Sequence, residues 1–344
     1  MGKQDGHNIK WIGIGPEDTF KVNKIPDFTD GSPTCNPLIA NIGGSFDVTI
    51  NDLNEVESKS LNGFGAIGGG DIQSGDFNHT LAITGNIIKN GMGFVLSPFF
   101  QVDSWDGTDM VFNVEDTNYT CITGSHTIYI PVGCGTLNSG SVLTGCIPVS
   151  IELNANERTW TVNFKTATYN TRPTPVMLPQ KANYNMGGLT DADFSIIKNK
   201  GKLTLDGAEL ETKSLTITLT YEERESEGMY DSTGEMTYFV VGNHKLIVSY
   251  SSDYDTADTA TNVTAAWLAD YKNRDIIENL GFVFNDNVSN SITGAFTGIR
   301  KVGKKNTPGS DLFSYDVDIE SVGNPAQTME IKVKDAFGDI TAEI

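Results

Sequence analysis

The sequence is poor in the residues on which most catalytic and metal sites depend. Four cysteines and four histidines occur in 344 residues, without a Cys-x-x-Cys pair or a histidine at zinc-ligand spacing. No serine lies in a nucleophile elbow, and the glycines at 13–15 and 63–75 lack the residues that complete a phosphate-binding loop. We therefore expect no enzymatic activity, no metal and no cofactor. Free or buried thiols are expected, although one disulfide among Cys121, Cys134 and Cys146 stays open.

Long apolar runs and basic residues are also scarce. No run approaches the roughly 20 apolar residues of a membrane span, and the first residues contain no hydrophobic signal core. We expect a chain made in a cytoplasm, without membrane contact. The 44 acidic residues outnumber the 24 basic ones, which gives a net charge of −20, and residues 1–172 and 173–344 carry −9 and −11. Because phosphate backbones are bound by basic surfaces, this balance disfavours specific DNA binding.

Short alternating apolar runs separated by Gly, Thr, Ser, Asn and Asp make up most of the chain, which predicts an all-β fold with one or two short helices. The expected strands are Ser45–Asn51, His79–Ile83, His126–Pro131, Ile147–Leu153, Trp160–Phe164, Ser214–Tyr221, Met236–Val241, Lys245–Tyr250, Gly294–Arg300, Tyr315–Glu320 and Thr328–Lys334. Helical spacing of apolar residues predicts a helix at Asn262–Leu280, and a weaker helical turn is expected at Gly85–Met92.

The stretch Ile147–Thr166 is the clearest β-hairpin. Its apolar residues fall on odd positions before the turn Asn154–Arg158 and on even positions after it, so each strand should bury one face. The residues expected to face the core are Ile147, Val149, Ile151, Trp160, Val162 and Phe164.

A second stretch, 315–335, repeats this hairpin pattern. Val149 matches Val317 at a shift of 168, and Phe46, Val48 and Ile50 match Leu215, Ile217 and Leu219 at 169. These shifts are close to half the chain length, which predicts a duplication into two similar β-sandwich or open-barrel domains, 1–172 with an N-terminal arm and 173–344. The proline-containing stretch 168–180 suits a connector. Chance similarity between alternating strands is the alternative interpretation.

Acidic residues are clustered. No basic residue occurs between Lys89 and Arg158, where seven acidic residues lie. A solvated face is one interpretation, and a surface that stays near nucleic acid without adhering to it is the other. A carbohydrate-binding or hydrolysing β-protein is a further alternative, with Trp105, Trp160 and Trp267 as stacking residues, although the sequence identifies no pair of catalytic carboxylates.

Three stretches resemble the tail tube proteins of long-tailed bacteriophages. WIGIGPEDTFKVNKIPDF at 11–28 looks like the start of many members, and TGCIPVSIELNANERTWTVNFKT at 144–166 is similar to their Gly-Cys strand, turn and strand. The stretch 74–96 resembles their strand followed by a short helical turn. The resemblance covers most of the chain in order, but each motif is short and degenerate.

The resemblance implies a structural virion protein whose sheets join those of neighbouring copies into a ring. Rings stack into the tail tube through which DNA passes without specific binding. A duplicated chain implies three copies per ring with approximate sixfold symmetry. The implied partners are further copies, the tape measure protein, the tail terminator and the baseplate, in a virion tail built from subunits made in the host cytoplasm. A baseplate or distal-tail ring protein of related fold is the nearest alternative.

Two sets of residues follow as candidates for these contacts. Loops 51–71 and 222–236 would reach the neighbouring ring, and an acidic face would line the lumen. The inter-ring candidates are Leu61, Phe64, Ile67, Glu222, Glu223, Glu225 and Glu227. The lumen candidates are Glu152, Glu157, Asp316, Asp318 and Glu320.

Overall fold

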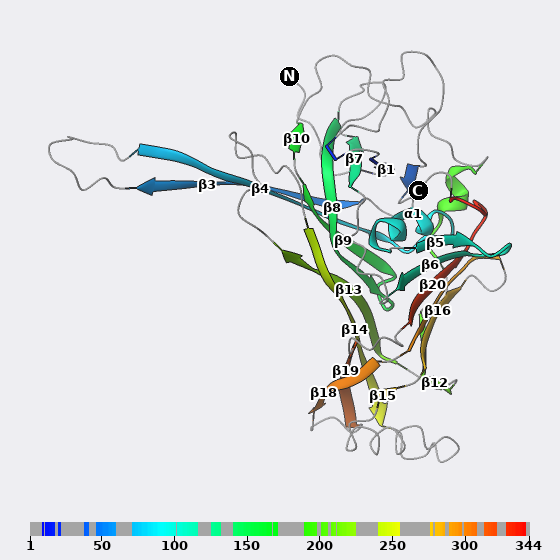
Figure 1. The fold of residues 1–344 in the computed structure, drawn as a ribbon. Helices are drawn as coiled ribbons and strands as arrows, with labels where there is room; N and C mark the ends of the chain where they lie inside the picture. Colours follow the sequence, from blue (N-terminus) through cyan, green and yellow to red (C-terminus); the bar gives the residue numbers. More distant parts are fainter. Residues whose placement is uncertain are drawn as a thin grey trace.

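A computed structural model describes most of the chain. The described residues are 9, 11–17, 20–21, 38–40, 46–59, 71–100, 102–115, 125–131, 140–166, 168–170, 189–197, 201–205, 208–210, 212–224, 240–254, 276–277, 279–285, 289–297, 299–307, 313–321 and 328–341. They form two antiparallel sheets and one short α-helix, so the expected all-β class is confirmed (Figure 1).

The larger sheet has thirteen strands. They are β1 (Trp11–Pro16), β2 (Leu38–Ala40), β3 (Asp47–Lys59), β4 (Asp71–Asn86), β7 (His126–Pro131), β8 (Gly140–Asn154), β9 (Thr159–Thr166), β10 (Thr168–Asn170), β13 (Ser214–Arg224), β14 (Val240–Tyr254), β15 (Ile276–Ile277), β18 (Ile299–Thr307) and β19 (Phe313–Ser321). Strand β8 pairs with β7 and β10 through its first half and with β9 and β13 through its second.

The smaller sheet has seven strands in the order β12-β11-β16-β17-β20-β6-β5. They are β5 (Val102–Trp105), β6 (Met110–Glu115), β11 (Lys202–Leu205), β12 (Ala208–Leu210), β16 (Leu280–Asn285), β17 (Ser291–Phe296) and β20 (Thr328–Lys334). Helix α1 (Met92–Leu96) and the 3-10 turns η2 (Ser97–Phe99) and η4 (Asp191–Phe194) complete the described elements.

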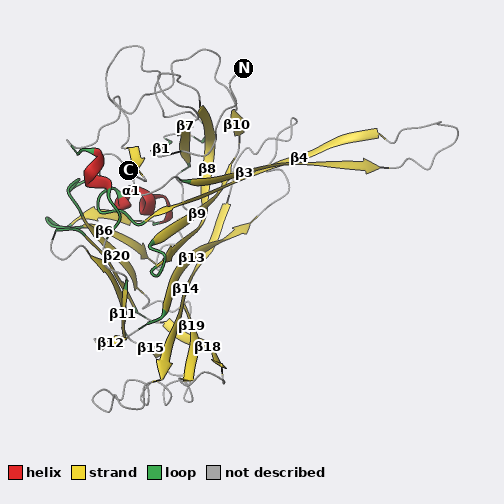
Figure 2. Ribbon diagram, turned by 180° about the vertical axis from the view of Figure 1, so that it is seen from behind, coloured by secondary structure: helices red, strands yellow, loops and turns green. Residues whose placement is uncertain are grey.

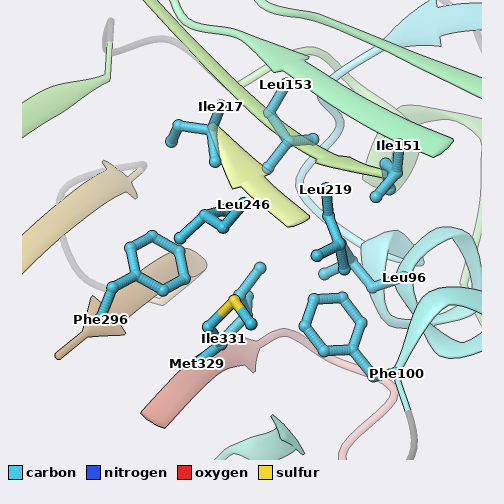
Figure 3. A pocket seen from close by; sticks show the side chains of 10 residues that line it. All are labelled: Leu96, Phe100, Ile151, Leu153, Ile217, Leu219, Leu246, Phe296, Met329 and Ile331. Atoms are coloured by element: carbon cyan, nitrogen blue, oxygen red, sulfur yellow. The ribbon is translucent and has the colours of Figure 1, made fainter. Parts of the chain in front are cut away.

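The two sheets pack face to face around an apolar core. Ile151, Ile217 and Leu246 of the larger sheet point toward Phe296 and Met329 of the smaller one (Figure 3). These side chains are 4% exposed or less. Burial of alternate residues on facing strands is what the alternating sequence pattern encodes, and it removes most of the apolar surface from water.

The hairpin at Ile147–Thr166 is confirmed as β8 and β9, with Ile151 opposite Val162 and Leu153 opposite Trp160. The Asn154 side chain shapes the turn, because its Oδ1 accepts the backbone N–H groups of Asn156 and Glu157, both at 3.1 Å.

The expectation that Val149 faces the core is wrong. A β-bulge between Pro148 and Ser150 leaves Val149 outside the ladder, half-buried rather than in the core. The extra residue shifts the alternation by one, so Pro148 shares the inward face with Ile151, whereas Ile147 lies on the opposite face; both isoleucines are buried.

Where the structure describes them, both predicted helical stretches contain strand residues. The end of the predicted helix Asn262–Leu280 is strand, because Ile276–Ile277 form β15 and Leu280 begins β16; residues 262–275 lie outside the described part. Leu280, Phe282 and Phe284 alternate as a strand that buries one face. In the weaker stretch, residues 85–86 end β4 and α1 begins only at Met92, since Gly91 has φ = 97°, a left-handed conformation that a helix interior excludes.

The predicted C-terminal hairpin is also wrong. Tyr315–Glu320 lies in β19 of the larger sheet, between β14 and β18, whereas Thr328–Lys334 is β20 of the smaller sheet, between β17 and β6. The expected strand Gly294–Arg300 is likewise divided between β17 and β18, in different sheets. Met236–Val241 and Lys245–Tyr250 overlap one strand, β14, although 236–239 lie outside the described residues.

A buried carboxylate attaches β1 to β7 and β8. Glu17, which follows β1, is 9% exposed and receives four hydrogen bonds. They come from Ser125 Oγ (2.5 Å), Thr127 Oγ1 (2.7 Å) and the backbone N–H groups of Gly145 and Lys21 (both 3.0 Å). Charge-assisted bonds of this number offset the cost of burying the carboxylate. No sequence signal pointed to Glu17.

His126 and Cys146 face each other across β7 and β8 beside this carboxylate. Burial and the nearby charge of Glu17 raise the pKa of the Cys146 thiol, so Cys146 stays a buried free thiol. Burial lowers the pKa of His126 to about 4, and its Nδ1 has no hydrogen-bond partner among the described residues. His126 is therefore neutral inside the folded chain at neutral pH.

The core assignment predicts a contrast between two substitutions. Ile319 is 1% exposed, so Ile319→Asp should bury an unpaired charge and destabilise the fold by about 4–5 kcal/mol. Val149→Asp places the same charge at the half-buried bulge, where a cost of about 1 kcal/mol is expected. Urea unfolding followed by circular dichroism measures both, and equal losses would contradict the assignment.

Buried neutral His126 predicts that acid weakens the fold. Its folded pKa of about 4 lies below the ordinary 6.5, so between these values the unfolded chain binds a proton that the folded chain does not. The free energy of unfolding should fall by up to about 3 kcal/mol as pH drops from 6.5 to 4. His126→Gln should remove this part of the pH dependence, as measured by urea unfolding at several pH values; an unchanged slope would contradict it.

Candidate functional site

The most informative region is the centre of the larger sheet, where one strand arrangement occurs twice. Strands β3, β4, β9 and β8 lie side by side in that order, and β13, β14, β19 and β18 follow in the corresponding order. In each unit two hairpins pair through their second strands. The units are joined by β8 and β13, which pair from Ser150–Thr220 to Asn154–Thr216.

The two units also agree in register. One row of paired residues runs Ile50, Leu81, Phe164 and Pro148, and the corresponding row runs Ile217, Val248, Ile319 and Lys301. Corresponding residues are 167 apart in the first two strands, 155 in the third and 153 in the fourth. The shift of 167 differs by two residues from the value of 169 read from the sequence. Because side chains alternate with a period of two, the same residues of these strands still face inward. The strand in the position of β9 is β19, and not β20.

The β-bulges fall at corresponding positions. The ladder between β3 and β4 skips Glu55, and that between β13 and β14 skips Glu222, which is again 167 residues later. The ladder between β8 and β9 skips Val149, and that between β18 and β19 skips Val302, 153 residues later. Bulges are specific features of a strand pair, so agreement at both positions is more demanding than agreement of strand order alone.

The two outer strands of this arrangement have open edges in the described part of the chain. Strand β3 pairs with β4 alone. Strand β18 pairs with β19 along its length, and on its other side with β15 at Ile299 and Arg300. An open edge presents backbone N–H and C=O groups to which another strand can pair.

Four of the five lumen candidates lie on the outward face of the larger sheet. Glu152 and Glu320 belong to one row across four strands, through Thr218 and Ile247. Asp318 and Asp316 are exposed and precede Glu320 on β19 by two and four residues, so they lie on the same side of the sheet. Glu157 lies instead in the exposed turn between β8 and β9.

Side-chain hydrogen bonds and an ion pair join neighbouring strands on this outward face. Thr84 Oγ1 and Thr161 Oγ1 are 2.9 Å apart, and Asn163 donates to Ser150 Oγ at 2.9 Å. Ser249 Oγ donates to Asp318 at 2.7 Å, and Lys245 Nζ lies 2.9 Å from Glu320. The face is thus hydroxyl-rich, with two of its carboxylates partnered across strands.

The inter-ring candidates fall on two long hairpins. The predicted loop 51–71 is shorter than expected, because β3 continues to Lys59 and β4 starts at Asp71; together they form an arm that projects from the body (Figures 1 and 2). The predicted loop 222–236 is likewise strand as far as Arg224, so Glu222 and Glu223 belong to β13. Leu61, Phe64, Ile67, Glu225 and Glu227 lie outside the described residues.

The features expected of a carbohydrate site are not brought together. Trp160 is 2% exposed in the core, Trp105 is half-buried on β5, and Trp267 lies outside the described residues. The gap between the two sheets (Figure 3) has a volume of about 10 Å³ and an apolar lining. Ligand pockets are typically hundreds of Å³, so this gap is a small packing defect.

No cluster of three His, Cys, Asp or Glu side chains suited to a metal occurs among the described residues. None of the helices described here is long and apolar enough to cross a membrane.

Sequence reasoning missed the basic character of β18. This strand contains Arg300, Lys301, Lys304 and Lys305, four of the 24 basic residues of an acidic chain, within nine positions. The local concentration of charge was visible in the sequence, but its position at a sheet edge was not.

Comparison with known proteins yields partial similarities. No family model and no curated protein matches the chain. Among solved structures, a chain from the virion of a native gene transfer agent particle aligns with 36% of this chain and 92% of its own, at 13% identity and a TM-score of 0.27. A chain from the baseplate of the anti-feeding prophage aligns with 35% of this chain and 85% of its own, at 12% identity and a TM-score of 0.22. These similarities are too slight to assign a family.

Proposed function

We propose that this chain is a structural virion protein, a tail tube subunit that self-assembles into stacked rings around a channel for genome passage and performs no catalysis. The observation that supports this proposal best is the four-strand unit that occurs twice in the larger sheet. The units are joined edge to edge by β8 and β13, and the outer strands have open edges in the described residues. A sheet built from repeated units is suited to extension by further units.

The repeated unit supports the duplication of the chain into 1–172 and 173–344. Each copy then supplies two successive units of a larger closed sheet. Three copies in a ring give six units and approximate sixfold symmetry. Closure by rotational symmetry pairs every edge, which removes the association hazard that open edges pose in a monomer.

The β3–β4 arm is proposed to contact the next ring. It extends beyond the body of the molecule (Figure 2). Its connecting segment contains Leu61, Phe64 and Ile67, which would gain stability from burial against a neighbour. The β13–β14 hairpin, with Glu222, Glu223, Glu225 and Glu227, would take the corresponding role in the second unit.

The outward face of the larger sheet is proposed to line the channel. Its acids, Glu152, Asp316, Asp318 and Glu320, would repel the DNA phosphates. Its hydroxyl groups are partly engaged across strands, as in the Thr84–Thr161 pair. DNA would pass such a surface without specific binding. The tape measure protein, tail terminator and baseplate are the further proposed partners in the virion tail.

Negative-stain electron microscopy of the concentrated protein tests the proposal. We expect hollow rings that stack into tubes, with six density lobes per ring formed by three chains. Mass photometry of isolated rings gives the number of chains. A protein that stays monomeric at high concentration, alone and with tail extract, would overturn the tube assignment, and single rings that never stack would support the baseplate alternative.

A shortened arm separates ring formation from stacking. Replacement of residues 60–70 by a short Gly-Ser turn should leave rings intact. It should raise the subunit concentration needed for stacking by about tenfold or more, because apolar burial between rings is lost. Sedimentation velocity compares this variant with the wild type. Tubes of normal length from the shortened protein would contradict the role of the arm.

A further inference from the structure

We infer that copies of this chain join by pairing the outer edge of β18 in one copy with the outer edge of β3 in the next, antiparallel and with Asp52 opposite Lys304. The inference rests on the proposed self-assembly and specifies its contact. The two segments are Gly303–Thr307 of β18 and Thr49–Leu53 of β3, both within described strands.

The register follows from the junction inside the chain. There β13 pairs with β8 from Thr216–Asn154 to Thr220–Ser150. Strand β3 corresponds to β13 at a shift of 167, and β18 corresponds to β8 at a shift of 153, with matching bulges. Transfer of the pairing by these shifts sets Thr49 opposite Thr307, Asn51 opposite Lys305 and Leu53 opposite Gly303.

The segment of β18 used in this pairing is open in the described structure. Strand β15 covers the outer edge of β18 at Ile299 and Arg300, which lie before Gly303. The inner edge of β18 is paired with β19 through Thr307. On β3 the described ladder is that with β4, on the opposite edge. A second copy can therefore pair here while every described ladder stays in place.

Charge supports this choice of strands over the alternatives. Strand β18 has four basic residues and no acidic one, whereas β3 has Asp47, Asp52, Glu55 and Glu57 and a single lysine at its end, Lys59. Pairing of β18 with β3 brings opposite charges together, which favours the encounter and fixes the register. Pairing of two β18 edges, or of two β3 edges, would bring like charges together.

The charge pattern also separates the contact between copies from the junction within the chain. In the β8–β13 junction, Glu152 is the single charged residue in the five pairs, and its partner is Thr218. In the inferred contact Lys304 and Asp52 are opposed, and Lys305 lies next to them. The contact between copies should therefore weaken with salt, whereas the junction within the chain should not.

A charge-exchange experiment tests the register. Lys304→Glu and Asp52→Lys are made singly and together, and the subunit concentration that gives half-maximal ring formation is measured by light scattering and sedimentation velocity. Each single variant should need an about tenfold or higher concentration because like charges are then opposed, and the double variant should return to the wild-type value. Circular dichroism melts check that each variant folds.

Lys301→Glu is the matched control, since it makes the same change on β18 outside the five inferred pairs. It should assemble at the wild-type concentration. If Lys304→Glu and Asp52→Lys form rings as well as the wild type does, the inferred register is wrong, but the proposed tube assignment is unaffected. Wild-type protein that forms no rings would overturn both. Loss of assembly in both single variants without recovery in the double variant would also overturn the inferred pairing.

Disulfide trapping gives a second, independent readout. A protein with Asn51→Cys is mixed with one carrying Lys305→Cys and oxidised. Paired positions in an antiparallel ladder are close enough for a disulfide, so a covalent dimer of the two variants is expected. Wild-type protein, with its own cysteines, controls for background dimers. A dimer that forms equally well when Lys301→Cys replaces Lys305→Cys would contradict the register.

Discussion

The backbone hydrogen bonding of β8 is the constraint on which the rest of the structure depends. This strand of fifteen residues pairs with β7 and β10 in its first half and with β9 and β13 in its second. It therefore connects the region held by Glu17 to the sandwich, and it connects one four-strand unit to the next. Its inward residues Ile151 and Leu153 also form part of the core between the sheets. The loss of its register would disturb all of these contacts together.

The same requirement for paired backbone groups links the fold to the proposed assembly. Within the chain, the second unit covers the edge of β8. Among the described residues, nothing covers the corresponding edge of β18 or the outer edge of β3 in the segments used for the inferred contact. In a monomer these edges would promote irregular association. In a closed ring the backbone N–H and C=O groups of each edge would pair with those of the next copy. The opposite charges of β18 and β3 would direct this pairing.

Local alternation was enough to predict much of the fold. The all-β class, the β8–β9 hairpin and its turn, and the strands His126–Pro131 and Thr328–Lys334 could be read from the sequence, because side chains on a strand alternate between two faces. Local reasoning failed where one residue changes the geometry. The bulge places Val149 outside the core, and the helix begins only at Met92 because Gly91 before it is in a left-handed conformation. The candidates Glu152, Asp316, Asp318 and Glu320 share a face, while Glu157 lies in a turn.

The sequence by itself determined which residues alternate between two faces, that residues 1–172 and 173–344 resemble each other, and how acidic the chain is. Only the tertiary structure decided which strands are neighbours. Tyr315–Glu320 and Thr328–Lys334 have the pattern of a hairpin, yet β19 and β20 lie in different sheets. The physical reason is that alternation depends on each strand's own side chains, whereas the choice of partner depends on long-range packing and on backbone groups that any strand can satisfy. For the same reason, the basic residues of β18 were visible in the sequence, but not the acidic strand to which we infer they pair.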